Sequence, residues 1–348
     1  MHDSVDSLFM KRALELAAQG AGHVAPNPLV GCVIVYQGEI IAEGYHARYG
    51  GHHAEVNAIE SVENSELLKD STLYVTLEPC AHHGKTPPCA NLILQKGIPR
   101  VVVGCRDPFP EVNGKGIEML RNNGVEVLTD VLFDECRAIN RRFFTFHEKK
   151  RPYVLLKWAQ SADGFMDVDR VSGRQGSVMI SHPDTQILVH TWRAEEASIL
   201  IGKNTLINDD PSLTVRRVPG KNPLRVVLSS QPLDLKAFKL GSDEAPTLVL
   251  TNETEGQNNN VRYVACDNVH NVASVLHRLQ RENVLSVLVE GGSNVLKSFL
   301  ESGLWDEARI IISDDVLGKG LTAPTIAVAY SHEERSASDT IRYFYNKS

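Results

Sequence analysis

The sequence lacks the features that mark several classes of protein. It contains no run of about 20 apolar residues, the length that a membrane-spanning helix requires. Its first residues are acidic before they are apolar, so they lack the basic-then-apolar order of a secretory signal peptide. We therefore expect a cytoplasmic protein that does not bind a membrane.

Positive charge is also scarce. The chain has 36 Lys and Arg residues against 43 Asp and Glu residues, for a net charge of −7, and no basic stripe of the kind that nucleic-acid binding usually needs. With 42% hydrophobic and 23% charged residues, the composition is that of a soluble globular protein rather than a disordered, collagenous or coiled-coil one. A length of 348 residues predicts two domains at roughly 150 residues each.

Cysteine is rare, and its placement is informative. The 6 cysteines are too few and too scattered for a disulfide framework. In a reducing compartment, clustered cysteines indicate metal binding or catalysis. Cys80 and Cys89 lie close together, in a segment with two histidines. Core packing is predicted for the cysteines in apolar runs, which are Cys32, Cys105 and Cys136.

Strand-like and helix-like segments alternate along the first half of the chain. Hydrophobic patterns predict strands at 29–36, 39–42, 73–77, 101–104 and 125–128. They predict helices over 9–17, from 53 or 54, after Pro88, through 117–121 and from about 130 to 146. This alternation favours an α/β fold with a sheet covered on both faces. The charged run 147–151 before Pro152 indicates a domain boundary; the alternative is a solvated helix end within one larger domain.

The second half starts a new α/β pattern. Strands are predicted at 153–157, 198–201, 224–228, 247–250, 284–289 and 341–345. Helices are predicted over 183–194, 271–281 and 293–301. The polar segment 251–260 predicts an exposed loop.

One group of residues in the first half has the composition of a metal site. His53 precedes a predicted helix, Cys80 follows a predicted strand, and Cys89 comes nine residues later. One histidine and two cysteines suit Zn²⁺ with three protein ligands and an open position, where bound water has its pKa lowered toward roughly 7. Glu55, two residues after His53, suits a group that carries a proton to a leaving amine. Zinc deaminases of nucleobases share this order, H-x-E followed by P-C-x-x-C, although the gap between the cysteines is longer here.

Other interpretations of this group stay open. His52 adjoins His53, and His82 and His83 lie between the two cysteines, so a closed, structural four-ligand zinc site is an alternative. Such a site would leave Glu55 without a role. A non-catalytic zinc-stabilised interaction module and a tRNA-editing deaminase are further alternatives, although the latter would need a basic surface.

The segments GHHAEVNAIE at 51–60 and EPCAHHGKTPPCANLI at 78–93 resemble the deaminase half of the bifunctional deaminase–reductases of riboflavin biosynthesis. PNPLVG at 26–31 fits the same family. The resemblance implies zinc on His53, Cys80 and Cys89, with Glu55 as the catalytic proton shuttle. It also implies a set of deaminase substrate contacts, which are Asn27, His46, His82 and Lys85.

The second half resembles the reductase of the same family, which looks like dihydrofolate reductase and uses NADPH. The matching segments are 151–164, 190–216 and 287–296. The implied substrate contacts are Ser177, Arg193, Leu213, Arg216 and Glu290, of which the two arginines could offer planar donors to a ribose phosphate. The implied cofactor contacts are Ala159, Thr205, Asp209 and Gly292. The roles of Lys157 and Asp163 are open, and Met179 stands where many members have a tryptophan.

The resemblance thus implies a cytidine-deaminase-like three-layer α/β/α domain over residues 1–147 and a dihydrofolate-reductase-like α/β domain over 148–348. The first domain would deaminate 2,5-diamino-6-ribosylamino-4(3H)-pyrimidinone 5′-phosphate. The second would reduce the ribosyl group of 5-amino-6-(5-phosphoribosylamino)uracil to ribityl with NADPH. The expected partner is this small phosphorylated pyrimidine. We expect no nucleic-acid or membrane partner, and we expect the protein to be a homo-oligomer. The alternative is a single-function zinc nucleobase or tRNA-editing deaminase with a non-catalytic second domain.

Overall fold

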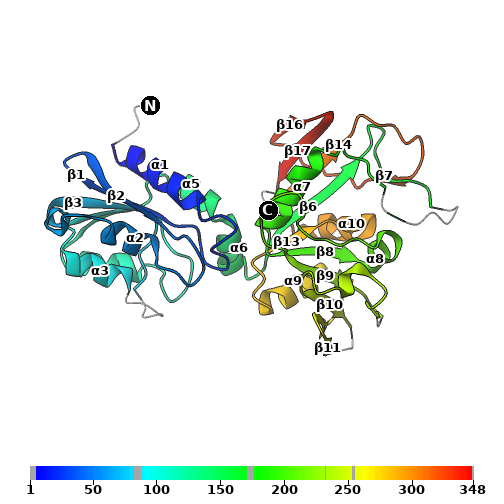
Figure 1. Cartoon of the computed structure of the whole chain (residues 1–348), viewed down its shortest axis with the longest axis horizontal. Helices are drawn as coiled ribbons and strands as arrows, with labels where there is room; N and C mark the ends of the chain where they lie inside the picture. The colour runs from blue at the N-terminus through cyan, green and yellow to red at the C-terminus, as the bar shows by residue number, and fades with distance from the viewer. Residues whose placement is uncertain are drawn as a thin grey trace. The chain divides into compact units, whose positions relative to one another are not determined.

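The computed structural model describes residues 5–81, 88–170, 176, 178–231, 233–252 and 255–346. The chain divides into two compact units, unit 1 with residues 1–149 and unit 2 with residues 150–348, both drawn in Figure 1. Within the described residues, no helix combines the length and the apolar character that crossing a membrane requires.

Unit 1 is built on a five-stranded sheet with the order β2-β1-β3-β4-β5. The strands are β1 (Gly31–Tyr36), β2 (Glu39–Tyr45), β3 (Ser71–Leu77), β4 (Arg100–Cys105) and β5 (Glu126–Leu128). β1 runs antiparallel to β2 and β3, whereas β3, β4 and β5 are parallel. Parallel strands are buried on both faces, which explains why β3 and β4 have nearly continuous apolar sequences.

Helices cover both faces of this sheet, so unit 1 has three layers. The elements are α1 (Val5–Ala18), α2 (Ala54–Glu60), the 3₁₀ turn η1 (Ser65–Asp70), α3 (Cys89–Lys96), α4 (Lys115–Asn122), α5 (Phe133–Ile139) and α6 (Arg141–Lys149). α1 and α5 pack on one face, and α2, α3 and α4 pack on the other (Figure 1). Cys32, Cys105 and Cys136 are buried in these cores, as predicted.

The single helix predicted from about 130 to 146 is wrong, because the chain breaks between α5 and α6. Asn140 lies at the break and is buried. Its side-chain oxygen accepts a hydrogen bond from the Leu29 N–H at 2.8 Å, and its side-chain nitrogen donates to the Leu29 carbonyl at 2.8 Å. The break thus places the buried Asn140 side chain, with both its oxygen and its nitrogen hydrogen-bonded, beside the segment that leads into β1.

Unit 2 is built on a ten-stranded sheet with the order β11-β12-β10-β9-β8-β13-β6-β14-β17-β16. The strands are β6 (Tyr153–Gln160), β8 (Ser198–Gly202), β9 (Leu224–Leu228), β10 (Thr247–Thr251), β11 (Gly256–Asn258), β12 (Val261–Ala265), β13 (Ser286–Val289), β14 (Glu307–Ile312), β16 (His332–Ser336) and β17 (Asp339–Tyr345). The strands from β12 to β14 in this order are parallel, and β11, β17 and β16 are antiparallel to their neighbours. A separate two-stranded sheet pairs β7 (Phe165–Asp167) with β15 (Leu321–Thr322).

Apolar cores lie on both faces of the large sheet. The helical elements of unit 2 are α7 (Thr185–Glu195), α8 (Lys203–Asp209), η2 (Lys239–Gly241), α9 (Val272–Arg281) and α10 (Ser293–Ser302). Leu156 of β6 belongs to the core that α9 and α10 cover, whereas the preceding Leu155 belongs to the core that includes Leu206 of α8. This alternation along one strand is typical of a parallel sheet with helices on both sides.

The predictions for unit 2 need correction in two respects. The predicted loop 251–260 contains the short strand β11, and several elements have no counterpart among the predicted ones, namely β7, β12, β14, β15, β16 and α8. β14 is hard to predict because its apolar run is interrupted by Glu307 and Arg309. Both are buried, and they form an ion pair at 2.7 Å within the strand, so two charged residues occupy core positions.

We predict that Asn140→Ala lowers the free energy of unfolding by about 2–4 kcal/mol, because it removes both side-chain hydrogen bonds to the partly buried N–H and carbonyl of Leu29. Chemical denaturation measures this loss. Asn123→Ala is the matched control: Asn123 is exposed at the end of α4, so its replacement should change the free energy by no more than about 0.5 kcal/mol. Equal effects of the two substitutions would contradict the role given to Asn140.

Candidate active sites

Unit 1 brings His53, Cys80 and Cys89 together from three segments. His53 immediately precedes α2, Cys80 follows β3, and Cys89 is the first residue of α3. The His53 Nδ1 atom lies 3.3 Å from Cys89 Sγ and 3.7 Å from Cys80 Sγ, and the three ligand atoms all lie within 4.8 Å of one another. Ligand atoms on a tetrahedral Zn²⁺ are separated by roughly 3.5–3.8 Å, given Zn–S and Zn–N bonds of about 2.3 and 2.0 Å. The cluster therefore has the size and the donor types that zinc requires.

The two thiols differ in their tendency to ionise. The hydrogen bond from the Cys89 thiol, and then the one from His53, lower the pKa of Cys80, which favours its thiolate form. The hydrogen bond to Cys80, together with burial, raises the pKa of Cys89. The thiolate is the form of cysteine that binds zinc. His52 is not part of the cluster, since its Nδ1 atom lies 3.4 Å from Glu60 Oε2.

Glu55 is held beside this cluster in the first turn of α2. Its side chain is buried, and its carboxyl group shares a hydrogen bond with Cys89. Burial raises the pKa of Glu55 to about 7. The helix comes this close because Gly44 of β2 has no side chain: a Cβ atom there would lie 2.4 Å from the Ala58 nitrogen. A buried carboxyl at this place can accept and return a proton.

Asn27 and His46 form a connected pair next to the same cluster. His46 is buried, and its Nδ1 atom lies 2.9 Å from the His52 carbonyl oxygen. Because a carbonyl only accepts, Nδ1 carries the proton, and Nε2 accepts from the Asn27 side-chain nitrogen at 3.1 Å. The His46 and His53 ring centres are 5.6 Å apart. The other predicted deaminase contacts, His82 and Lys85, lie outside the described residues, as does His83.

Glu78 is a residue of this site that the sequence alone did not single out. It is buried just before Cys80, and its carboxylate accepts hydrogen bonds from the Gly114 and Gly116 N–H groups at 2.9 Å and from Ile117 at 3.2 Å. The first N–H groups of α4 are thus satisfied by an acidic side chain from another segment. Glu78 thereby ties the start of α4 to the strand end that leads to Cys80.

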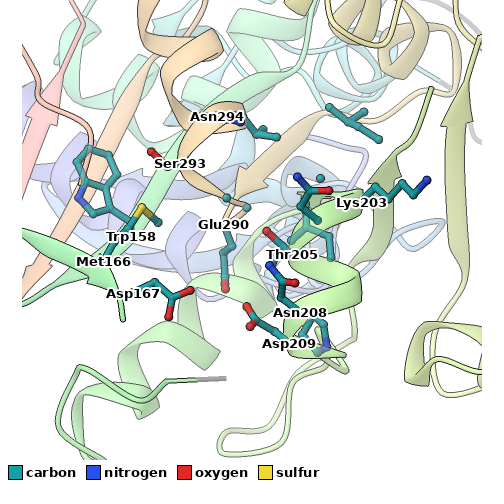
Figure 2. Close-up of a pocket in the computed structure, with 18 of the residues that line it drawn as sticks. Trp158, Met166, Asp167, Lys203, Thr205, Asn208, Asp209, Glu290, Ser293 and Asn294 are labelled. Atoms are coloured by element: carbon teal, nitrogen blue, oxygen red, sulfur yellow. The ribbon is translucent and has the colours of Figure 1, made fainter. Parts of the chain in front are cut away.

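Unit 2 contains a cavity of about 630 Å³ at the carboxyl ends of β6, β8 and β13, beside α8 and α10. Figure 2 shows side chains from β6, β7, α8 and the start of α10 around it. Parallel α/β sheets bind their ligands at this edge. The predicted reductase residues that line the cavity are Ala159, Arg193, Thr205, Asp209, Leu213, Glu290 and Gly292.

The two remaining predicted reductase residues are Arg216 and Ser177. Arg216 is not among the lining residues. Its N–H donates to His190 Nδ1 at 3.0 Å, and its guanidinium donates to the Thr214 hydroxyl at 2.7 Å. Ser177 lies outside the described residues.

Glu290 is the centre of a largely buried charge cluster in this cavity. Arg193 donates to both carboxylate oxygens, at 2.8 and 2.7 Å, and Lys157 Nζ lies 3.8 Å from one of them. Burial alone would raise the pKa of Glu290, but Arg193 and Lys157 lower it to about 2. Glu290 is therefore ionised, and Lys157, whose role the sequence left open, is one of its two cationic neighbours.

The start of α10 has the features of a phosphate site. Gly292 has a φ of 68°, and a Cβ atom there would lie 2.9 Å from the Thr205 hydroxyl oxygen. The Ser293 hydroxyl lines the cavity and is buried without a hydrogen-bond partner among the described residues. A glycine turn, free helix N–H groups and an unpaired hydroxyl suit the phosphates of a dinucleotide. The cavity thus suits a cofactor that carries phosphate groups.

Arg170 is a further residue of this cavity that the sequence did not indicate. Its guanidinium donates to Asp209 of α8 at 2.8 Å and also to Asp167 of β7. It thereby joins two segments that are about forty residues apart in the chain. No local pattern marks such a contact.

Comparison with known proteins first defines the class. A family model described as the cytidine and deoxycytidylate deaminase zinc-binding region matches residues 3–105. A second model, described as the RibD C-terminal domain, matches residues 152–329. The chain is therefore a zinc-type deaminase joined to a reductase.

The relatives then define the family. The riboflavin biosynthesis protein RibD of Aquifex aeolicus is 40% identical over 330 residues, which is 93% of this chain and 91% of that protein. RibD of Escherichia coli is 34% identical over 332 residues, 90% of this chain and 89% of that protein. The crystal structure of the deaminase–reductase from Thermotoga maritima has a TM-score of 0.88 and 38% identity, and covers 98% of this chain and 99% of its own. Acinetobacter baumannii RibD has a TM-score of 0.86 and 31% identity, and covers 99% of both chains.

This chain belongs to the RibD family of riboflavin biosynthesis proteins. It is a bifunctional enzyme, a deaminase followed by a reductase, and its cofactors are Zn²⁺ and NADPH. The predicted fold class, a cytidine-deaminase-like domain and a dihydrofolate-reductase-like domain, is confirmed. The single-function alternative is not favoured.

We predict that Arg193→Met lowers the free energy of unfolding by about 3–5 kcal/mol at neutral pH, because it leaves the buried Glu290 carboxylate with a weaker partner. The pKa of Glu290 then rises, since burial is no longer offset by Arg193. Protonation of Glu290 below that pKa removes the unpaired charge, so the loss should shrink on acidification.

Denaturant unfolding of both proteins at several pH values measures this dependence. In the wild type, the folded pKa of about 2 lies below the unfolded value, so Glu290 contributes stability that is lost as the pH falls through about 2. Lys297→Met, on the exposed face of α10, is the control. A loss in Arg193→Met that grows on acidification would contradict this account.

Proposed function

We propose that this chain catalyses two steps of riboflavin biosynthesis, one in each unit. Residues 1–147 would form the deaminase domain and residues 148–348 the reductase domain. The observation that supports this most strongly is that one chain combines the His–Cys–Cys–Glu cluster with a cavity suited to a dinucleotide. The T. maritima relative is named a diaminohydroxyphosphoribosylaminopyrimidine deaminase and 5-amino-6-(5-phosphoribosylamino)uracil reductase, which supports the same substrates here.

In the deaminase, His53, Cys80 and Cys89 would hold the zinc ion. Bound zinc lowers the pKa of water and so supplies a nucleophile at neutral pH. Glu55 would take a proton and return it to the exocyclic nitrogen that leaves as ammonia. Its burial and its contact with Cys89 place it next to the ligand cluster.

Asn27 and His46 would orient the pyrimidine ring. Since the Asn27 side-chain nitrogen is used on His46, the Asn27 amide is fixed in one orientation, and its oxygen is left to accept from the substrate. His82 and Lys85 stay predictions from the family resemblance. A phosphorylated pyrimidine also agrees with a chain of net charge −7, which favours a small substrate over a polynucleotide.

In the reductase, NADPH would supply the hydride. Ala159, Thr205, Asp209 and Gly292 would contact this cofactor, and all four line the cavity. Glu290 is proposed to contact the sugar of the substrate, since it is ionised and can accept from hydroxyl groups. The other proposed substrate contacts are Ser177, Arg193, Leu213 and Arg216. A cytoplasmic location and a homo-oligomeric state stay predictions from the sequence.

Glu55→Gln tests the deaminase proposal. It keeps the shape of the side chain but removes its proton transfer, so ammonia release should fall by about 10²–10⁴-fold while the zinc content is unchanged. NADPH oxidation with substrate that is already deaminated should be unaffected, because Glu55 belongs to unit 1.

Glu60→Gln is the matched control for this experiment, because Glu60 is an exposed residue of the same helix. It should leave ammonia release unchanged. Normal ammonia release by Glu55→Gln would show that Glu55 is not the proton shuttle. Failure of the wild type to oxidise NADPH with deaminated substrate would instead favour a single-function deaminase.

A further inference from the structure

The cationic side chains that line the reductase cavity are not equivalent. Those of the described residues are Lys157, Arg170, Arg193 and Lys203. Carboxylates in the same cavity already neutralise most of them. Arg193 and Lys157 lie 2.7 and 3.8 Å from Glu290, and Arg170 is bonded to Asp167 and Asp209.

Lys203 is different. Among the described residues, no carboxylate oxygen forms an ion pair with it, and its Nζ atom donates a hydrogen bond to the Gln231 side-chain oxygen at 3.1 Å. Gln231 is neutral, so it holds the ammonium group in place without offsetting its charge. Lys203 is partly buried as a residue, whereas its bond to Gln231 is exposed, so the ammonium group is accessible to a ligand that enters the cavity. One positive charge without a carboxylate partner among the described residues therefore lies in the cavity wall.

The position of Lys203 separates it from the reacting end of the cavity. Lys203 is the first residue of α8, directly after β8, and Gln231 follows the neighbouring strand β9. Ser229 and Ser230, from the same end of β9, also line the cavity. In Figure 2 the Lys203 side chain extends away from Glu290, where the substrate is proposed to bind.

We propose that Lys203 gives this enzyme its preference for NADPH over NADH, by pairing with the phosphate on the 2′-oxygen of the adenosine ribose. This inference rests on the proposed reductase function. The two cofactors differ only in that phosphate, so discrimination needs a cation that neither the substrate nor a carboxylate of the protein occupies. Lys203 meets both conditions, and a lysine ammonium suits a phosphate as a point charge.

The surrounding charges make this cation necessary. Asp167, Asp209 and Glu290 line the same cavity, and the whole chain carries a net charge of −7. These carboxylates already use the charges of Lys157, Arg170 and Arg193. The 2′-phosphate of NADPH adds negative charge beyond the pyrophosphate that both cofactors carry, so without Lys203 no surplus cation of the described lining residues would favour NADPH.

Nucleotide binding to the full chain tests this proposal. NADPH and NADH are titrated by the fluorescence of their reduced nicotinamide, and adenosine 2′,5′-bisphosphate and AMP by calorimetry. Lys203→Ala should weaken the binding of NADPH and of the bisphosphate by at least about tenfold. It should change the affinities for NADH and AMP by less than about twofold. Lys203→Arg keeps the charge and should keep the preference, and Lys297→Ala, outside the cavity, should change nothing.

Gln231→Glu gives a second test that leaves Lys203 in place. A carboxylate at this position would neutralise the ammonium group. The binding of NADPH should therefore again weaken by at least about tenfold, while the binding of NADH should not weaken. This variant keeps the size of the side chain, and the circular dichroism of each variant checks that it is folded.

Three results would overturn the proposal in different ways. Equal losses for NADPH and NADH in Lys203→Ala would mean that Lys203 contacts a part that both cofactors share. No loss for either would mean that the 2′-phosphate binds elsewhere. A wild-type chain that binds neither nucleotide would overturn the proposed reductase function itself, and the assignment of Lys203 with it.

Discussion

Both sites depend on one constraint: parallel strands end at a common edge of their sheet, so the residues that follow them meet there. In unit 1, β2 and β3 lie on either side of β1 and both run antiparallel to it, so His46 after β2 lies at the same edge as Cys80 after β3. In unit 2, Lys203 follows β8 and Glu290 follows β13, two parallel neighbours. In each unit, the residues that carry the chemistry lie on short segments at this edge of the sheet.

The two sites differ in how their charged groups are paired. The zinc cluster gathers histidine and cysteine donors around a space for one cation, and the buried Glu55 carboxyl lies beside it. The reductase cavity instead pairs its charges in advance, with Glu290 held by Arg193 and with Asp209 held by Arg170. Lys203 is the exception, because its hydrogen-bond partner is the neutral side-chain amide of Gln231. Anionic nucleotides can therefore bind a protein of net negative charge.

Sequence reasoning found the features that are local in the chain. The zinc ligands and Glu55 stand in short motifs, and most strands are continuous apolar runs, so both could be predicted. Contacts between distant segments could not. The Asn140 break, the buried ion pair that hides β14, and the bond from Arg170 to Asp209 each depend on a partner that tertiary packing supplies. Lys203 likewise becomes informative only when its neutral partner, Gln231, is seen.

The stoichiometry of the complete reaction tests the central claim most directly. The purified chain, loaded with zinc, is mixed with the diamino pyrimidine phosphate and excess NADPH, and ammonia release and NADPH oxidation are followed together. Two consecutive activities in one chain predict that equal amounts of ammonia and oxidised NADPH are formed, with ammonia appearing first. Ammonia release without NADPH oxidation, or NADPH oxidation before any ammonia, would contradict the account.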